Sequence, residues 1–348
     1  MNPYVLAFLL SSLGMGTVIT FSSSHWLLAW MGLEINTLAI IPLMAQHHHP
    51  RAVEATTKYF LIQATAAAMI LFASTMNAWV TGEWNISSPP TPLSSLIITI
   101  ALALKIGMAP VHLWMPEVLQ GLDLLTGLIM STWQKLAPFA LIIQTTQITD
   151  PLLLTSLGII SSLVGGWGGL NQTQLRKILA YSSIAHMGWM IIISQYAPQL
   201  TMIALGLYIF MTSAAFLTLK TLMTTKINTL TMAWSKSPTL TSISALTLLS
   251  LGGLPPLTGF MSKWLIIQEL TKQSLPITAT IMALTALLSL FFYLRLCHAM
   301  TLTISPNTNN LIPQWRAETT QSPLPLTTTT MIATGILPLT PAILMLAT

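Results

Sequence analysis

Apolar residues occur along almost the whole chain in long runs, and short stretches between them carry most of the polar and charged residues. A helix needs about 20 consecutive apolar residues to cross the hydrocarbon core of a bilayer. On this criterion the runs predict an all-α polytopic membrane protein with about eleven transmembrane helices. The predicted segments are Pro3–Thr20, Trp26–Met44, Tyr59–Val80, Leu93–Leu113, Leu122–Gln144, Leu152–Leu170, Leu175–Ser194, Leu200–Leu222, Leu240–Leu270, Ile277–His298 and Leu326–Leu346.

Two apolar runs are too long for one upright helix and too short for two. The first extends over Leu93–Leu122 and the second over Leu240–Leu270. Each contains a Gly-x-x-Pro sequence, Gly107 to Pro110 in the first run and Gly252 to Pro255 in the second. These residues predict helices that are broken inside the membrane, where the freed backbone must be buried in protein or line a cavity.

The two broken segments are the fourth and the ninth in the chain, hence the fourth members of two successive sets of five. Because five is odd, the two sets would cross the membrane in opposite senses, as in inverted-repeat transporters. Chance is the alternative, since Gly and Pro are common in membrane helices. We therefore predict two inverted five-helix repeats, with broken helices 4 and 9, and a C-terminal helix. The predicted domains are 1–148, 149–300 and 301–348.

The composition is that of a membrane protein and gives no sign of a cofactor site. Of 348 residues, 53% are hydrophobic and 6% are charged, whereas about 25% are charged in an ordinary soluble domain. The 13 basic residues are scattered, so they form no patch for nucleic acid. Cys297 is the only cysteine, and the chain has neither a glycine-rich phosphate loop nor a histidine pair spaced for haem. We expect no cofactor, metal or redox centre to be bound by this chain.

The basic residues predict the orientation in the membrane. Nine of the thirteen lie at even-numbered connections, on the side of the N-terminus, and Lys272 lies on the opposite side. By the positive-inside rule the N-terminus faces the cytoplasm or matrix, and an odd number of helices places the C-terminus across the membrane. Five tryptophans near the ends of predicted spans are assigned to an interfacial aromatic belt, namely Trp26, Trp30, Trp79, Trp84 and Trp114. The nine residues are Arg51, Lys58, Arg176, Lys177, Lys220, Lys226, Lys236, Arg295 and Arg316.

Four charged residues lie inside the apolar runs, namely Glu34, Lys105, Lys135 and Lys263. A charge at the bilayer centre costs at least ~2.5–3.5 kcal/mol on insertion scales, so such residues usually face a protein interior or a water-filled path. The alternatives are a long side chain that reaches back to the interface, or a salt bridge that only fixes two helices together. Glu34 is too short and Lys135 too deep for the first alternative, which stays open for the other two lysines.

Buried lysine and glutamate are suited to proton transfer. Burial shifts the pKa of either group by up to about 3–5 units toward its neutral form, and an opposite charge shifts it back. Moving one charge against 100 mV costs about 2.3 kcal/mol, which corresponds to about 1.7 pKa units. A lysine whose acidic partner moves therefore has enough range to bind and release a proton against a membrane potential.

Two histidines are further candidates for a proton relay, because an imidazole titrates near neutral pH and has two exchangeable nitrogens. His112 follows the first helix break, and His186 lies in a run that contains several hydroxyl groups. The alternative for each is a hydrogen bond that links two helices. Glu117 and Asp123 are expected to be helix-start charges, with proton entry as the alternative. The run His47–His49 is not expected to bind a metal, since no carboxylate or thiolate lies at ligand spacing.

Three motifs resemble the antiporter-like proton-channel family, and the resemblance extends over essentially the whole chain. They are Lys105-x-Gly-x-x-Pro-x-His112-x-Trp114-x-Pro116, Arg176-Lys177-Ile-Leu-Ala-Tyr-Ser-Ser183 and Gly253-Leu-Pro-Pro256-x-x-Gly259-Phe-x-x-Lys263. The resemblance implies a proton-pumping subunit, and so part of a translocase, in the membrane arm of the respiratory NADH:ubiquinone oxidoreductase. It implies a multi-pass protein of the mitochondrial inner membrane, with the N-terminus on the matrix side and the C-terminus on the intermembrane-space side. The residues that it places on a charged axis along the membrane midplane are Glu34, Lys105, Lys135 and Lys263, with His112 and His186 near it.

The same resemblance implies the partners and the location of the cofactors. Flavin, iron–sulfur clusters, NADH oxidation and ubiquinone reduction belong to sister subunits. The partners are other membrane-arm subunits and phospholipids, and neither nucleic acid nor a second copy of the chain. The ordinary family member has fourteen helices, so the absence of three N-terminal ones implies a neighbouring subunit or lipid at that flank. The second half of the chain contains no intramembrane acid that matches Glu34.

Two other readings of the sequence remain open. The first is a free-standing cation/proton antiporter, which would have the same architecture and would exchange ions by itself. The second is a structural subunit whose intramembrane charges only fix the packing of its helices.

Overall fold

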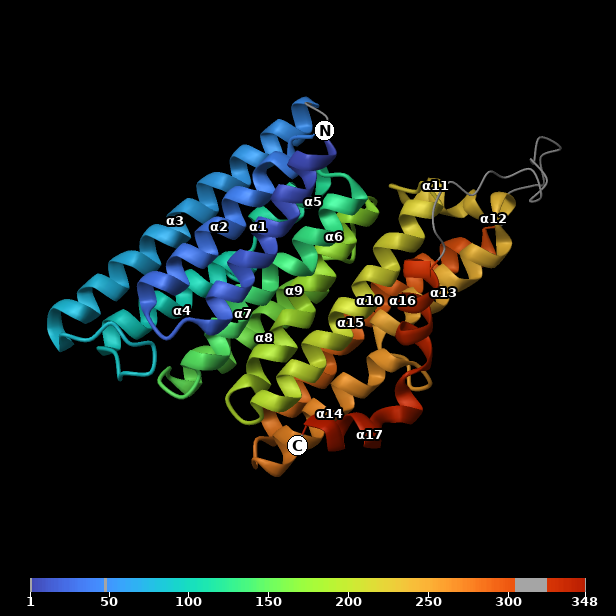
Figure 1. Ribbon diagram of the computed structural model, residues 1–348. Coiled ribbons are helices and arrows are strands. Elements are labelled where there is room, and N and C mark those ends of the chain that lie inside the picture. The colour runs from blue at the N-terminus through green and yellow to red at the C-terminus, as the bar shows by residue number, and fades with distance from the viewer. Residues whose placement is uncertain (1, 47–48, 304–323, 348) are drawn as a thin grey trace. The chain divides into compact units, whose positions relative to one another are not determined.

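The computed structural model describes residues 2–46, 49–303 and 324–347, and every regular element in these ranges is a helix (Figure 1). Two isolated β-bridges join loops, one between His25 and Asn85 and the other between Gln174 and Lys226. The chain forms two compact units, Met1–Ser161 and Ser162–Thr348. The predicted all-α class is confirmed for the described part of the chain.

The first unit is built around α4, which packs against α3 and α7, while α2 packs against α1 and α3. Helix α5 turns back onto α3. The helices of this unit are α1 (Pro3–Ser22), α2 (Trp26–Met44), α3 (Pro50–Thr81), α4 (Pro92–Ile106), α5 (Trp114–Gly121), α6 (Leu124–Ser131), α7 (Trp133–Thr145) and the first part of α8 (Pro151–Gly168).

The second unit surrounds α13 and α14, which contact α10, α15 and α16. Helix α9 is buried along most of its length and contacts α10, α14 and α15. The helices of this unit are the end of α8, α9 (Leu175–Ser194), α10 (Pro198–Thr221), α11 (Ile227–Thr231), α12 (Ala233–Lys236), α13 (Pro238–Gly252), α14 (Thr258–Lys272), α15 (Pro276–Leu302), α16 (Leu324–Gly335), the 3₁₀ turn η2 (Leu337–Leu339) and α17 (Thr340–Ala347).

Proline marks the start of many of these helices, because the first turn needs no backbone donor and the ring already holds the helical φ angle. Helices α1, α3, α4, α10, α13 and α15 all begin in this way. Glycine marks three ends, where Gly82, Gly107 and Gly253 adopt the left-handed conformation with φ near +80°. A side chain would be strained there, so these glycines fix where α3, α4 and α13 stop.

Seven described helices are long and apolar enough to cross a membrane, and an eighth crossing is present if α16 and α17 form one bent span. The chain is therefore an integral membrane protein. The shorter apolar helices α4 and α13 are the first halves of the two segments that the sequence predicts to be broken.

The predicted fifth segment, Leu122–Gln144, is not one continuous helix. It ends as α6 at Ser131 and restarts as α7 at Trp133. The hydroxyl of Thr132 donates to the carbonyl of Leu128 at 2.7 Å, a bond that bends helices. This third break was not predicted, because a single threonine in an apolar run is a weak signal.

Two further segments differ from their predicted form. Helix α3 begins at Pro50, nine residues before the predicted start at Tyr59, and has 32 residues. The predicted last span, Leu326–Leu346, is bent by 66° between α16 and η2–α17. Prolines within this stretch remove backbone donors and so interrupt the helix. The predicted long loop from Thr301 to Pro325 lies mostly outside the described residues.

Candidate functional site

The first helix break places the end of α4 in the interior of the first unit. Gly107, with φ of 82°, closes the helix, and the N–H of Met108 donates to the carbonyl of Ala103 at 2.9 Å. This is the Schellman arrangement, which satisfies part of the free carbonyls at a helix end. The chain then runs through a short loop and turns into α5 at Trp114. The break predicted from Gly107 and Pro110 is therefore present.

Two side chains also bond carbonyls in the last turn of α4. The indole Nε1 of Trp114 donates to the carbonyl of Leu104 at 3.1 Å. The amide of Gln63, from α3, donates to the carbonyl of Lys105 at 3.4 Å. Trp114 is 6% exposed, so its assignment to the interfacial belt is wrong. Its indole instead completes the hydrogen bonding of the broken helix.

Lys105 occupies the last turn of α4 and is 6% exposed. Its ammonium nitrogen has no hydrogen-bond partner within the described ranges. Glu34, half-buried on α2, is the acid that acts on it electrostatically, and Glu34 itself accepts a hydrogen bond from Thr37 at 3.4 Å. A buried charge costs several kcal/mol unless polar groups surround it. This arrangement therefore requires a functional explanation.

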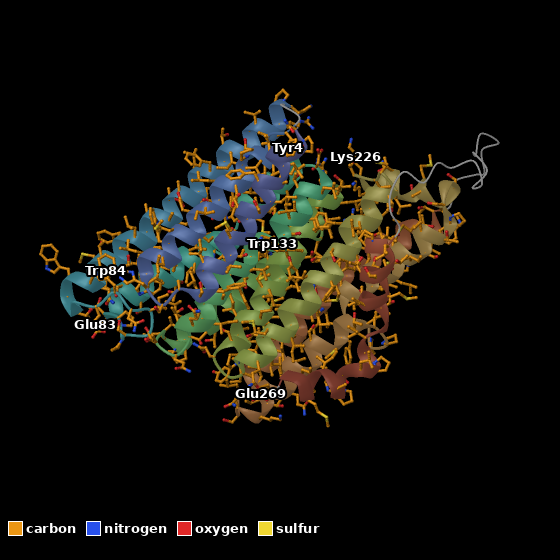
Figure 2. The ribbon with its side chains drawn as sticks, viewed as in Figure 1. Tyr4, Glu83, Trp84, Trp133, Lys226 and Glu269 are labelled. Carbon is orange, nitrogen blue, oxygen red and sulfur yellow. The ribbon has the colours of Figure 1, made fainter. Side chains whose placement is uncertain are left out.

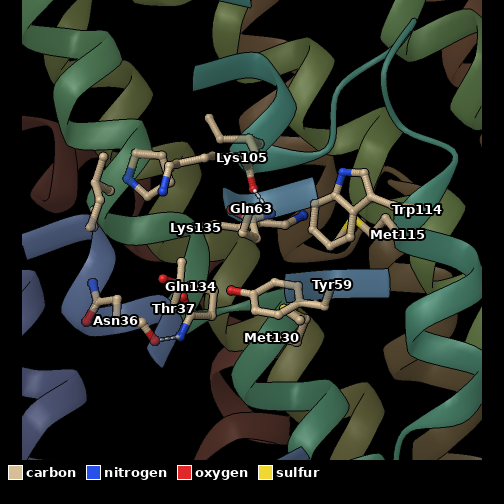
Figure 3. Close-up of a pocket in the computed structure, with 14 residues that line it drawn as sticks. Asn36, Thr37, Tyr59, Gln63, Lys105, Trp114, Met115, Met130, Gln134 and Lys135 are labelled. Carbon is tan, nitrogen blue, oxygen red and sulfur yellow. Dashed lines mark hydrogen bonds between the residues drawn. The ribbon is translucent and has the colours of Figure 1, made fainter. Parts of the chain in front are cut away.

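A small cavity lies against Lys105, and Lys135 also lines it (Figure 3). Its volume of about 10 Å³ is enough for roughly one water molecule. Figure 3 shows that neutral polar side chains from α2, α3 and α7 complete the wall. These are Asn36, Thr37, Tyr59, Gln63 and Gln134.

Lys135 reaches this cavity because α7 starts beside it. It stands in the first turn of α7, three residues after Thr132, and is 2% exposed. Pro138, inside the same helix, has no N–H to bond the carbonyl of Gln134, four residues earlier. The side-chain amide of Gln134 is engaged elsewhere, since it donates to the carbonyl of Asn36 at 3.2 Å.

Asn36 is the polar residue of the cavity wall that is least satisfied. It is 2% exposed, and neither its amide oxygen nor its amide nitrogen has a hydrogen-bond partner in the described part of the chain. Gly16 and Gly32 let α1 and α2 approach closely here, since a Cβ at Gly16 would overlap the Asn36 amide. Buried amides are normally hydrogen-bonded, so Asn36 makes the cavity wall more favourable for a water molecule.

His112 lies in the loop between α4 and α5 and is buried. Its Nδ1 is 3.3 Å from the carbonyl oxygen of Pro110, and its own carbonyl accepts from the N–H of Met115 at 3.0 Å. His112 is thus held by the backbone of the break, and it is not among the residues that line the cavity.

The second helix break lies in the second unit and has the same backbone. Gly253, with φ of 82°, ends α13, and the N–H of Leu254 donates to the carbonyl of Leu249 at 3.4 Å. Gly253, and not Gly252, therefore corresponds to Gly107 of the first break. The relevant Gly-x-x-Pro sequence is Gly253 to Pro256, so the predicted position was one residue too early.

Lys263 follows this break, in the second turn of α14, whereas Lys105 precedes the first break. Its ammonium donates to the carbonyl of Gly252 at 2.8 Å. The side chain is 7% exposed and lies against Gly253, where a Cβ would come within 3.0 Å of the ammonium. Lys263 thus caps the end of α13.

His186 also belongs to the second unit, on the buried helix α9. It is 7% exposed, and its ring lies 5.7 Å from the ring of Tyr208 on α10, measured between centroids. The structure thus brings Lys105 and Lys135 to one cavity, with Glu34 acting from α2. It places Lys263 and His186 in a different unit.

Several charged residues outside these sites lie near helix ends, among them Glu83, Lys226 and Glu269 (Figure 2). Glu117 stands in the first turn of α5, as predicted, and its carboxylate is 2.8 Å from the ammonium of Lys58. Asp123 precedes α6 without a side-chain cap.

The histidine run at 47–49 was predicted not to bind a metal. His47 and His48 lie outside the described residues, while His49 caps α3 by accepting from the N–H of Arg51 at 3.2 Å. In the described part of the chain, no three or more His, Cys, Asp or Glu side chains are grouped to hold a metal ion.

Sequence reasoning missed the neutral polar residues that line the cavity. Asn36, Gln63 and Gln134 carry no charge, and each lies inside a predicted apolar segment. A signal was available, because an amide inside a membrane segment is costly unless it is hydrogen-bonded. Tyr59 gave no signal, since it lies at the start of its predicted span.

Comparison with known proteins agrees with this geometry. Residues 23–289 match the family described as NADH:quinone oxidoreductase/Mrp antiporter, TM, and residues 290–344 match the NADH dehydrogenase subunit 2 C-terminus. The NADH-ubiquinone oxidoreductase chain 2 of Danio rerio is 78% identical over 348 residues, which is 100% of both chains.

Solved structures show the same fold. A chain of respiratory complex I from Thermus thermophilus with bound aureothin has a TM-score of 0.83 and 27% identity, covering 95% of this chain and 77% of its own. A chain of the Mrp complex from Dietzia sp. DQ12-45-1b has a TM-score of 0.81 and 16% identity, covering 97% and 76%. On these matches, over both units and the whole length, the chain belongs to the NADH:quinone oxidoreductase/Mrp antiporter family, within the group of NADH-ubiquinone oxidoreductase chain 2 proteins.

Proposed function

We propose that this chain is a core membrane-arm subunit of a respiratory NADH:ubiquinone oxidoreductase and that it translocates protons while other subunits transfer electrons from NADH to ubiquinone. It is part of a translocase. We place it in the mitochondrial inner membrane, with the N-terminus on the matrix side and the C-terminus on the intermembrane-space side. Family membership supports the complex, and the distribution of basic residues supports the orientation.

One observation supports the proton-handling part of this proposal, namely that the buried ammonium of Lys105 has no hydrogen-bond partner among the residues that the structure describes. A scaffold has no need for such a group, because an apolar side chain of similar size would avoid the cost of burying a charge. A proton carrier needs it, since lysine can release its proton inside a protein and arginine cannot. Lys105 is therefore the residue that we assign to proton binding in the first unit.

The cavity gives Lys105 an exchange partner. Lys135 lines the same cavity, and two ammonium groups at one small site repel each other. A proton that arrives at one lysine therefore favours release of a proton from the other. Glu34 acts on Lys105 from α2, so a change in the charge or position of Glu34 shifts the balance. Tyr59 and Gln134 orient the transferred proton through their hydroxyl and amide groups.

His112 and His186 are assigned as relay residues, His112 in the first unit and His186 in the second. His112 is fixed by the backbone of the first break, and His186 is buried on α9 beside Tyr208. Lys263 is assigned to proton binding in the second unit, where its ammonium must leave the carbonyl of Gly252 before it can deliver a proton. Each candidate residue of the polar path along the midplane is thus assigned a role within its own unit.

The architecture that we propose has eleven transmembrane segments in two inverted five-helix repeats, 1–148 and 149–300, followed by 301–348. The matching Schellman ends at Gly107 and Gly253, each in the fourth segment of its set, support the repeat. Partners are other membrane-arm subunits and phospholipids, in a complex with one copy of this chain. NADH, flavin, iron–sulfur clusters and ubiquinone belong to the sister subunits.

The test is proton delivery by the assembled complex. We expect Lys105→Met to lower the rate of proton delivery into liposomes, per assembled complex, by about tenfold or more at the affected step, since a positioned proton-transfer group typically contributes 10²–10⁴-fold. Glu34→Gln is expected to act in the same direction. The matched control is Lys58→Met, which removes an exposed lysine outside the cavity. Full proton delivery by both Lys105→Met and Glu34→Gln would contradict the proposal and favour a scaffold.

A free-standing cation/proton antiporter is the competing function, and the Mrp-like fold is compatible with it. That likeness has only 16% identity, whereas full-length identity of 78% ties the chain to a complex subunit. Purified chain in liposomes separates the two, because an antiporter would exchange Na⁺ or K⁺ for protons without partner subunits.

A further inference from the structure

The second unit contains a group of buried hydroxyls that the proposed function does not yet use. Tyr208 on α10 and Tyr293 on α15 are each 0% exposed. Both face α9, where Ser182 and Ser183 lie one turn before His186. Ser182 is 1% exposed and Ser183 is 0% exposed. Phenol groups are seldom buried so completely in a helix bundle without a hydrogen-bonding role.

The Tyr208 hydroxyl is hydrogen-bonded to Ser183. The hydroxyl of Ser183 donates to the carbonyl of Ala180 at 2.6 Å, so it accepts the proton of Tyr208 on a lone pair. The ring of Tyr208 lies against His186, with 5.7 Å between the centroids. Tyr208 therefore bonds Ser183 of α9 through its hydroxyl and contacts the His186 imidazole through its ring.

The Tyr293 hydroxyl is completely buried beside Ser182, yet no partner among the described residues meets hydrogen-bond geometry with it. Ser182 faces it, and Ser182 donates to the carbonyl of Leu179 at 2.8 Å, so it can only accept from the phenol in this state. Tyr293 and Tyr208 also act on each other electrostatically. A buried phenol without a partner costs about 1–3 kcal/mol, so Tyr293 calls for an explanation.

Tyr293 packs on the residue that holds Lys263. A Cβ at Gly252 would lie 3.6 Å from Cδ2 of Tyr293, and the carbonyl of Gly252 accepts from the Lys263 ammonium at 2.8 Å. The last residue of α13 is thus in contact with Tyr293 and hydrogen-bonded to Lys263. The order along the interior of the unit is Lys263, Tyr293, the two serines with Tyr208, and His186.

We propose that Tyr293 and Tyr208, with Ser182 and Ser183, carry protons between Lys263 and His186. This relay rests on the proposed function, because it supplies the route between two residues that the function assigns. Each hydroxyl accepts a proton on a lone pair and releases its own to the next group, so no hydroxyl changes its charge and no redox step occurs. Ser182 resets by rotating its O–H back to the carbonyl of Leu179. A water molecule at the Tyr293 hydroxyl joins the relay to the Lys263 ammonium.

The test uses tyrosine-to-phenylalanine substitutions, which remove only the hydroxyl and keep the ring. In the assembled complex, we expect Tyr293→Phe and Tyr208→Phe to lower proton delivery in the same direction as Lys263→Met, and no further than that variant. The matched control is Tyr196→Phe, at a half-buried position in the turn after α9, which is expected to keep wild-type proton delivery. Because the residues share one path, Tyr293→Phe added to Lys263→Met is expected to cause no further loss.

Two readouts separate a relay from a packing role. Tyr293→Phe removes an unsatisfied hydroxyl, so the thermal stability of the complex is expected to stay unchanged or rise while proton delivery falls. If Tyr208→Phe impairs assembly, Ser183→Ala removes the acceptor with less change in packing, and its proton delivery is expected to fall. Wild-type proton delivery by Tyr293→Phe, and by Tyr208→Phe or Ser183→Ala, would overturn the relay.

The proposed function is judged separately by Lys105→Met in the same assay. Loss of proton delivery in Lys105→Met, with none in the tyrosine variants, contradicts the relay alone. Full delivery in both the Lys105 and the Lys263 variants contradicts the proposed function, and the relay with it.

Discussion

The two broken helices of this chain share a backbone and differ in chemistry. Each ends at a glycine with φ of 82° in a Schellman arrangement. In the first break Trp114 and Gln63 bond two carbonyls of α4, and the Lys105 ammonium has no partner within the described residues. In the second break the Lys263 ammonium itself bonds the carbonyl of Gly252. Two breaks with the same backbone thus differ in their lysines, because Lys263 is held by a backbone carbonyl and Lys105 is not.

The difference follows from the side of the break on which the lysine stands. Lys105 precedes Gly107, so its side chain leaves from the helix that ends there. Lys263 follows Gly253 by ten positions along the chain, so its side chain points back to the preceding helix end. A cation at a helix C-terminus is stabilised by the helix dipole. Where the neutral donors Trp114 and Gln63 bond the helix end instead, the lysine ammonium remains available for proton transfer.

The packing of the second break gives the largest expected effect. A Cβ at Gly259 would overlap the carbonyl oxygen of Ser250, so α14 rests directly on the end of α13. In the first break, the nearest atoms to a Cβ on Gly107 are the side chains of Trp114 and Met115. We expect Gly259→Ala to destabilise the subunit by about 3 kcal/mol or more, through overpacking against backbone.

Abundance of the subunit in membranes and the melting temperature of the complex measure this effect. Gly206→Ala on α10 is the control, since a Cβ there meets nothing within 4 Å. A Gly259→Ala complex as stable as the Gly206→Ala complex would show that the two helices of the second break do not touch as described.

Removal of the lysines is expected to change stability in opposite directions. Lys263→Met leaves the carbonyl of Gly252 without its donor, which costs about 1–3 kcal/mol. Lys105→Met removes a buried charge for which the described ranges offer no hydrogen-bond partner, so stability is expected to stay unchanged or rise. Thermal dissociation of the complex compares the two variants. Equal destabilisation by both would remove the central contrast between the breaks.

The capping role of Trp114 is expected to be smaller. Trp114→Phe keeps an aromatic ring but deletes the donor to the carbonyl of Leu104, which retains a bond of 3.2 Å from the N–H of Gly107. The expected loss is about 1 kcal/mol, read as a shift in melting temperature. A Trp114→Phe protein that melts like wild type would return this residue to a purely apolar packing role.

The smallest effect is expected for the ion pairs at the start of α3. Lys58 contacts Glu54 at 2.9 Å and Glu117 at 2.8 Å, and all three side chains are well exposed. Exposed ion pairs contribute about 0–1 kcal/mol, so Lys58→Met is expected to alter stability by about 0.5 kcal/mol or less. A larger loss, measured in low and in high salt, would show that this end of α3 is less solvated than its exposure indicates.

Much of the fold could be predicted because it depends on local patterns. The apolar runs determine the spans, and glycine with proline marks the breaks. The break at Thr132 was missed because a hydroxyl that bonds its own helix leaves no distinctive pattern. The choice of Gly252 over Gly253 failed for a related reason, since both glycines precede a proline by three positions. Only the backbone angle distinguishes them.

The site was predicted in part. A charged residue in an apolar run is a strong signal, whereas the residues that lie beside it in space are not encoded in the local sequence. Lys105 and Lys135 were singled out, yet their shared cavity depends on how α4 and α7 pack. Trp114 was misplaced, since a tryptophan near a span end suits either an interface or a cap. The capping of α13 by Lys263 could be read only from the three-dimensional arrangement.

The length of α3 has a consequence for labelling experiments. A rod of 32 residues is about 48 Å long at 1.5 Å per residue, whereas the oily layer is about 30 Å thick. Its surplus turns at the Pro50 end carry Lys58, which is 42% exposed at its side chain. An amine-reactive reagent that cannot cross lipid should therefore modify Lys58 from one face of sealed vesicles only, and should leave the enclosed Lys105 unmodified from both faces.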